Sequence, residues 1–332
     1  MSPPQSGSAL AERRPPDPEL LRRVLALAPL LRPTPVVPLR TQGLELYAKL
    51  EFHNPFGSIK DRTAYWILKG AVERGELRSG ATVVESSSGN FAFALAGFAK
   101  LLGLRFVPVI DPNITGVTES FLRRTCDRVV KVEERDETGG YLGTRLRKVQ
   151  ELCAEIPGAY WPNQYGNPDG MDAHYQLTGA ELCQQLERLD LVFIGVSTGG
   201  TIAGVSRRLK ERFPAVRIVA VDAVGSVIFG GAPQRRHIPG IGASVVPELV
   251  AHARIDEVVM IPERQTAEAC QALLWEHGLF VGGSSGSAFA AARQYPVLMK
   301  AQKPPVAVFI CPDRGTAYLE TVYNPGWVAR LT

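Results

Sequence analysis

The chain has 332 residues, of which 45% are hydrophobic and 21% charged, and its formal net charge is +4. This composition is typical of a globular protein that buries a sizeable core and has room for two domains. Because the positive charge is small and scattered, and no apolar run reaches about 18 residues, we expect neither nucleic-acid binding nor membrane insertion.

The N-terminal segment, residues 1–17, is rich in Pro, Ser and Arg, which predicts a flexible tail. Asp17 followed by Pro18 is typical of a helix start, and we expect a helix over residues 18–31. Charged residues interrupt its leucines and no cleavage pattern follows, so we expect no signal peptide and a cytoplasmic protein.

A lysine follows the next predicted strand, residues 46–52, at a tight Asn-Pro-Phe-Gly turn. Lys60 then opens a predicted helix over residues 59–73, at the mouth of an α/β sheet, where ligands bind. An amine placed there can lose its proton and form a Schiff base. Taken alone, Lys60 would be assigned to the solvated surface; the loops that follow favour catalysis.

Two later strand–helix junctions are rich in serine and glycine. Glu-Ser-Ser-Ser-Gly-Asn, residues 85–90, opens a predicted helix over residues 91–102, and its hydroxyls and free amides suit a carboxylate or a ring hydroxyl. Ser-Thr-Gly-Gly-Thr, residues 197–201, opens a predicted helix over residues 202–213, and its bare amides suit a phosphate. The second loop lacks the nucleotide and dinucleotide fingerprints, which favours a lone phosphate ester.

A third loop of this kind, residues 282–287, also opens a helix. One such loop would be ordinary helix capping, but three of them together with the lysine turn indicate a binding site.

Apolar runs alternate with helical stretches along the chain, and their apolarity is continuous. Such runs predict parallel strands buried on both faces, and therefore an α/β fold. They lie at residues 81–85, 104–110, 191–195, 217–222, 257–261 and 306–311.

The five cysteines and five histidines are isolated from one another, without Cys-x-x-Cys or ligand spacing. We therefore expect free thiols in a reducing compartment and no metal site.

Taken together, the motifs resemble the cysteine synthase branch of pyridoxal-phosphate enzymes, which have fold type II, the tryptophan-synthase-β-like fold. The resemblance covers residues 34–323. It implies two α/β domains with mostly parallel sheets, the active site in the cleft between them, and a homodimer. The smaller domain would take residues 54–162, and the larger one residues 18–53 and 163–332.

The resemblance also assigns roles to residues. Lys60 would hold pyridoxal 5′-phosphate covalently and later remove the α-proton of the substrate. The phosphate would lie on Ser197, Thr198, Gly199, Gly200 and Thr201, while Asn90 would contact the ring hydroxyl. The substrate α-carboxylate would be bound by Ser87, Ser88 and Gln164, and Gly240 and Gly242 would let the backbone approach closely.

Ser284 matches the partner of the pyridine nitrogen. A hydroxyl cannot keep that nitrogen protonated as a carboxylate would, so the ring is a weaker electron sink and β-replacement is favoured over transamination. Asp222 is an alternative acid for the ring, or else a solvated aspartate at a strand end.

The chain departs from ordinary cysteine synthases at Phe91, Tyr165 and Ser197, and the last two changes add hydroxyls near the cleft. Arg145 is a further candidate, either for binding a substrate phosphate or carboxylate or as a solvated helix arginine.

With these departures the chain is similar to a narrower group, the N-(2-amino-2-carboxyethyl)-L-glutamate synthases of siderophore and peptide-antibiotic pathways. Such enzymes join O-phospho-L-serine to L-glutamate and release phosphate, and an oxidase then frees L-2,3-diaminopropionate. Two alternatives remain open: a cysteine synthase that uses O-phosphoserine or O-acetylserine with sulfide, and a non-catalytic cofactor-binding paralogue that acts as a partner protein.

Overall fold

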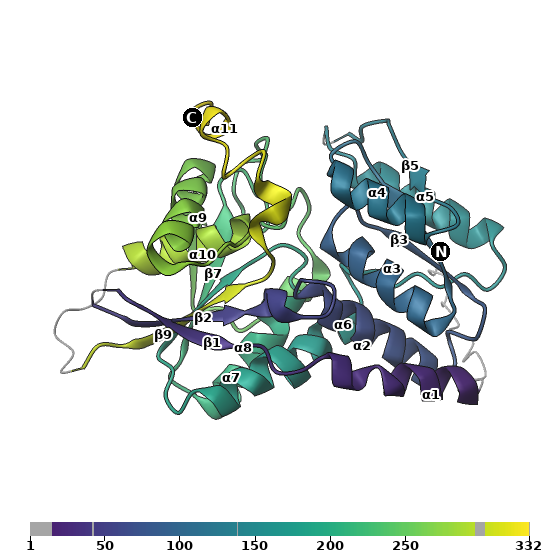
Figure 1. The fold of residues 1–332 in the computed structure, drawn as a ribbon, viewed down its shortest axis with the longest axis horizontal. Coiled ribbons are helices and arrows are strands. Elements are labelled where there is room, and N and C mark those ends of the chain that lie inside the picture. The colour runs from purple at the N-terminus through teal and green to yellow at the C-terminus, as the bar shows by residue number, and fades with distance from the viewer. Residues whose placement is uncertain (1–14, 42, 138, 296–302, 332) are drawn as a thin grey trace, which may run out of the picture.

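The computed structural model describes residues 15–41, 43–137, 139–295 and 303–331, which form two β-sheets with flanking helices (Figure 1). Most of the predicted tail, residues 1–17, lies outside the described residues. Asp17 does cap the first helix, because its carboxylate accepts the backbone N–H groups of Glu19 and Leu20.

The larger sheet has the strand order β1-β2-β9-β6-β7-β8, and the smaller one β3-β4-β5. β1 and β2 pair antiparallel, and the other neighbours pair in parallel, which confirms the predicted α/β class. The strands are β1 (Val36–Leu39), β2 (Glu45–Leu50), β3 (Thr82–Ser86), β4 (Arg105–Ile110), β5 (Val130–Lys131), β6 (Leu191–Gly195), β7 (Arg217–Ala223), β8 (Glu257–Ile261) and β9 (Val306–Cys311).

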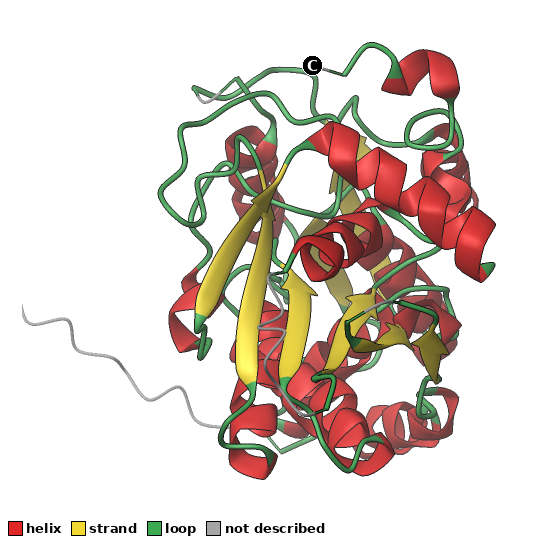
Figure 2. Cartoon of the chain, turned by 90° about the vertical axis from the view of Figure 1, so that its left-hand side faces the viewer, coloured by secondary structure: helices red, strands yellow, loops and turns green. Residues whose placement is uncertain are grey.

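The helices cover both faces of the larger sheet, as Figure 2 shows. The α-helices are α1 (Pro18–Ala26), α2 (Lys60–Glu73), α3 (Asn90–Leu102), α4 (Gly116–Thr125), α5 (Leu142–Glu155), α6 (Pro168–Ala173), α7 (Ala180–Gln185), α8 (Gly200–Arg212), α9 (Glu263–His277), α10 (Gly283–Gln294) and α11 (Pro325–Val328). A π-helical stretch, His174–Gly179, joins α6 to α7.

The continuous apolar strands are buried from both sides. In β6, Phe193 packs in the core that includes α10, whereas Val192 and Ile194 point to the opposite core, which includes α8. The expectation is wrong for β8, which exposes Val258 and Met260 because it is an edge strand with helix cover on one face only.

Element boundaries follow local chemistry. β2 ends two residues earlier than predicted, where a 3₁₀ turn, Glu51–His53, begins. α3 ends as predicted at Gly103, whose φ of 70° is left-handed. α8 starts two residues earlier than predicted, so that Gly200 and Thr201 belong to its first turn.

Candidate active site

A cavity of about 330 Å³ lies where the carboxyl ends of strands from both sheets meet. The chain brings helix starts to the same place, namely those of α2, α3, α8 and α10. The lining includes Lys60, Ser86–Phe91, Asp111, Asn113, Thr115, Thr118, Arg145, Gln164, Tyr165, Gly195–Gly199, Thr201, Gly240, Ser284, Asp313 and Tyr318. Most of the residues predicted for the site therefore converge on one cavity.

Lys60 is the first residue of α2, and its Nζ donates to Thr198 Oγ1 at 3.1 Å. Burial lowers the pKa of Lys60 to about 8, with the charge of Glu85 opposing the shift. With that pKa about a tenth of the amine is neutral at pH 7, far more than in an ordinary lysine, and Schiff-base formation requires the neutral form.

The glycine-rich loop after β6 faces Lys60. Gly199 caps α8 with a φ of 86°, and a methyl group there would lie 2.8 Å from the Val250 backbone nitrogen. Only glycine fits this position without strain. Ser197 donates to the carbonyl of Gly242 at 3.2 Å, which fixes the loop. Gly200 and Gly242 support the loop but lie outside the cavity lining.

The opposite wall carries amide and hydroxyl groups. Asn90 donates from Nδ2 to Asp313 Oδ2 at 2.7 Å, and the Tyr318 hydroxyl donates to the same oxygen at 2.9 Å. Burial raises the pKa of Asp313, and these two hydrogen bonds oppose the shift. Ser284 is buried in the first turn of α10 and lines the cavity.

The predicted carboxylate-binding residues are held by local hydrogen bonds. The Ser87 hydroxyl accepts the Ala92 N–H at 3.1 Å, so it caps α3. The Ser88 hydroxyl donates to Asp111 Oδ2 at 3.1 Å. Gln164 donates from Nε2 to the carbonyl of Ser86 at 3.2 Å.

Arg145 is not a solvated helix arginine. Its side chain is 13% exposed, lines the cavity and lies 3.2 Å from the Asp111 carboxylate. Its Nε is buried without a hydrogen-bond partner among the described residues. Burial raises the pKa of the Tyr165 hydroxyl, and the charge and hydrogen bonding of Arg145 oppose the shift. Arg145 and Tyr165 thus lie side by side on one wall of the cavity.

Sequence reasoning missed several lining residues. Asp111 directly follows the buried parallel strand β4, and Asp313 lies two residues after the end of β9, another buried parallel strand; these positions could have marked them. Asn113, Thr115 and Thr118 line the cavity from the loop after β4 and the start of α4. By contrast, Asp222 is neither solvated nor cavity-lining: it is buried at the end of β7.

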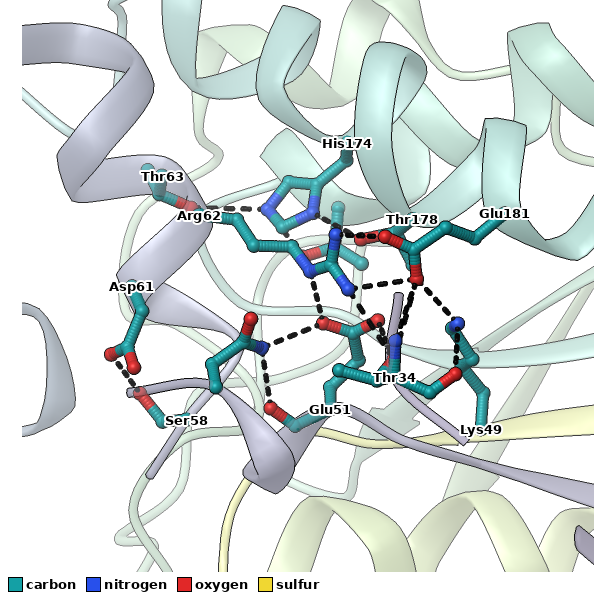
Figure 3. A network of polar contacts seen from close by, with 12 residues as sticks. Thr34, Lys49, Glu51, Ser58, Asp61, Arg62, Thr63, His174, Thr178 and Glu181 are labelled. Carbon is teal, nitrogen blue, oxygen red and sulfur yellow. Dashed lines mark hydrogen bonds and ion pairs between the residues drawn. The ribbon is translucent and has the colours of Figure 1, made fainter. Parts of the chain in front are cut away.

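A buried ionic network lies next to the lysine turn (Figure 3). Arg62 is fully buried and donates to Glu51 Oε2 at 2.6 Å and to Glu181 Oε2 at 2.8 Å. Lys49 donates to Glu181 Oε2 at 2.6 Å. The first turn of α2, which carries the catalytic lysine candidate, is thereby tied to the end of β2 and to α7.

His174 extends this support to the glycine-rich loop. Its Nε2 lies 3.0 Å from Thr63 Oγ1 and 3.3 Å from Thr201 Oγ1. Burial holds the pKa of His174 well below its usual range, so the ring is neutral.

All five cysteines are free thiols, as expected. Within the described part of the chain, no cluster of three or more His, Cys, Asp or Glu side chains could hold a metal ion. None of the described helices is long and apolar enough to cross a membrane.

These residues fit pyridoxal phosphate. Lys60 offers an amine of lowered pKa, the α8 N-terminus offers bare amides beside a glycine that no other residue could replace, and Ser284 offers a hydroxyl.

The family model described as pyridoxal-phosphate dependent enzyme matches residues 27–313. The chain belongs to this family, and pyridoxal 5′-phosphate is its cofactor.

Among the relatives, two N-(2-amino-2-carboxyethyl)-L-glutamate synthases are similar along most of the chain. That of Ralstonia nicotianae is 44% identical over 288 residues, or 86% of this chain and 85% of the relative. The synthase of Cupriavidus metallidurans is 44% identical over 304 residues, which cover 90% of this chain and 89% of the relative.

Solved structures agree in fold. The O-acetylserine dependent cystathionine β-synthase of Helicobacter pylori has a TM-score of 0.79 at 30% identity, covering 89% of this chain and 97% of that one. O-ureido-L-serine synthase has a TM-score of 0.81 at 28% identity, and the match covers 93% of this chain and 98% of that one.

Proposed function

We propose that the protein joins O-phospho-L-serine and L-glutamate by β-replacement, giving N-(2-amino-2-carboxyethyl)-L-glutamate and phosphate. The 44% identity to two synthases named for that product supports the choice. The observation that carries it is Arg145, a cavity-lining guanidinium whose buried Nε has no hydrogen-bond partner among the described residues. A guanidinium binds a phosphate through charge-assisted hydrogen bonds, whereas a sulfide or an acetate ester would gain little from it.

Each residue has a proposed task. When bound, pyridoxal phosphate supplies the electron sink that makes the donor α-proton acidic. Nζ of Lys60 takes that proton, and the amides of the 197–201 loop bind the cofactor phosphate. Ser284 contacts the ring nitrogen without protonating it, and Asn90 contacts the ring hydroxyl. Ser87, Ser88 and Gln164 orient the donor carboxylate, while Arg145, with Tyr165 beside it, binds the leaving phosphate.

The test is phosphate release from O-phosphoserine by purified holoenzyme, with and without glutamate. We expect glutamate to accelerate release and to be consumed in equal amount.

Sulfide-dependent cysteine formation without a glutamate response would instead support the cysteine synthase alternative. A protein that binds the cofactor but turns over neither O-phosphoserine nor O-acetylserine, with glutamate or with sulfide, would support the non-catalytic paralogue.

We further infer a cytoplasmic homodimer that catalyses a step toward 2,3-diaminopropionate for a siderophore or peptide antibiotic, with the domain division given above. These inferences depend on the family resemblance. Sedimentation of the holoenzyme would test the dimer.

A further inference from the structure

Two residues of opposite charge form an ion pair on the cavity wall next to the smaller sheet. Arg145, from α5, lies 3.2 Å through Nη1 from Oδ2 of Asp111, at the end of β4. The Ser88 hydroxyl contacts both, at 3.1 Å from Asp111 and 3.2 Å from Arg145. The side chains are 6% and 13% exposed, so solvent screens the pair weakly.

Both groups keep hydrogen-bonding capacity. Asp111 accepts the Asn113 N–H through Oδ1 at 2.8 Å, and Oδ1 of a carboxylate has a further lone pair for a donor. Arg145 has an Nε without a partner among the described residues. A ligand can therefore bind Asp111 through Oδ1 without first breaking the contact between the pair, whereas the buried Nε of Arg145 becomes available only when the side chains around it move.

The other charged side chains on the cavity wall have other tasks. Lys60 is the proposed cofactor lysine, and Asp313 receives hydrogen bonds from Asn90 and Tyr318. Among the described lining residues, Asp111 and Arg145 are thus the acid and base left to face the substrates.

An α-amino acid carries an ammonium and a carboxylate on one carbon, which matches a carboxylate beside a guanidinium. We propose that Asp111 and Arg145 together bind the acceptor amino acid as a zwitterion, with its ammonium on Asp111 and its α-carboxylate on Arg145. This inference rests on the proposed function. Arg145 binds the donor phosphate first, and the acceptor carboxylate takes its place once the phosphate has left. The departing phosphate carries away the proton that Lys60 took from the donor α-carbon, so the Lys60 amine is neutral again. It then takes one proton from the ammonium on Asp111, the amine forms the new bond to the donor β-carbon, and Lys60 returns the proton to the α-carbon.

The ion pair between Asp111 and Arg145 also explains why the nucleophile would be an amino acid and not sulfide. A carboxylate attracts an ammonium but repels a hydrosulfide anion, so Asp111 favours an amino acid over sulfide.

The test compares glutamate with glutarate, which lacks only the ammonium group. In phosphate release from O-phosphoserine, KM is measured for glutamate and the competitive inhibition constant for glutarate. In Asp111→Asn, which keeps the side-chain size, we expect the preference for glutamate over glutarate to fall by about tenfold or more. Asp111→Glu, which keeps the charge, should retain part of the preference.

Asp127→Asn, an exposed aspartate after α4, is the matched control and should leave the preference unchanged. If Asp111→Asn weakens the binding of glutamate and of glutarate equally, Asp111 only positions Arg145. The proposal of a zwitterion site is then wrong. Sulfide-dependent turnover of the natural enzyme without a glutamate response would overturn the zwitterion site and the proposed function together.

Discussion

At the scale of single residues, the proposed chemistry depends on a lysine that burial keeps less basic than usual. The pKa of Lys60 is lowered to about 8, so its neutral fraction increases as the pH rises through that value. We expect the rate at which apoprotein recombines with pyridoxal phosphate to rise with pH and to level off above about 8. Stopped-flow absorbance would measure it.

Lys60→Ala should abolish turnover while leaving room for noncovalent cofactor binding. Lys69→Ala, in the same helix and paired with Glu73, is the matched control and should be active. Repeated turnover by Lys60→Ala would show that the proton acceptor is another group.

Arg145 differs from a surface arginine because its side chain is only 13% exposed and lines the cavity. Arg145→Ala should weaken substrate capture by about 1–3 kcal/mol, because a charged hydrogen bond in a poorly solvated wall is lost. Cofactor affinity should hardly change. Steady-state kinetics with both substrates would check this, with Arg147→Ala, exposed on the same helix, as control. An unchanged KM for both substrates would show that Arg145 does not bind either of them.

At the scale of elements, the α8 start depends on one backbone conformation. Gly199→Ala places a side chain at a φ of 86° and against Val250, so the loop must shift. A left-handed alanine costs about 1–2 kcal/mol even before the collision. We expect cofactor affinity, measured by absorbance titration, to fall about tenfold or more.

Gly116→Ala is the control for that titration, since its added methyl group meets nothing within 4 Å and φ is not positive. An equal loss of affinity in both variants would argue against a special role for the α8 start.

The network behind α2 is a second feature at this scale. Removing the fully buried Arg62 leaves the carboxylates of Glu51 and Glu181 without their main partner. Arg62→Met should therefore reduce the free energy of unfolding by about 3–5 kcal/mol.

Urea denaturation would measure that loss. Arg123→Met, which removes an exposed ion pair with Glu119, should cost less than about 1 kcal/mol. Similar losses in the two variants would mean that the buried network contributes no more than a surface pair.

At the scale of the whole molecule, the candidate site lies between two sheets that have separate cores. A ligand that binds only the folded state at about 100 times its dissociation constant adds about 2.7 kcal/mol of stability. We expect removal of pyridoxal phosphate to lower Tm by several degrees, as measured by calorimetry. Adding back pyridoxal, which lacks the phosphate, should raise Tm by less than adding back pyridoxal phosphate, because the 197–201 loop then has no ligand.

Much of this molecule could be predicted from local sequence. The parallel α/β class follows from continuous apolar strands such as β9, which is buried along its whole length. The lysine turn and the serine- and glycine-rich loops fall at strand–helix junctions, and parallel strands bring such junctions to the same edge of a sheet.

Other features depend on which segments meet in space. Asp111 and Arg145 are 34 positions apart and lie on different elements, so no local pattern pairs them. The exposure of β8 depends on its place at the sheet edge, and the burial of Arg62 depends on Glu181 arriving from α7. The sequence by itself therefore determined the fold class and the cofactor, and it predicted the loops proposed to bind that cofactor, because those depend on backbone conformation and residue type at neighbouring positions. Tertiary structure alone decided which charges face the cavity, because burial and ion pairing arise from contacts between distant segments.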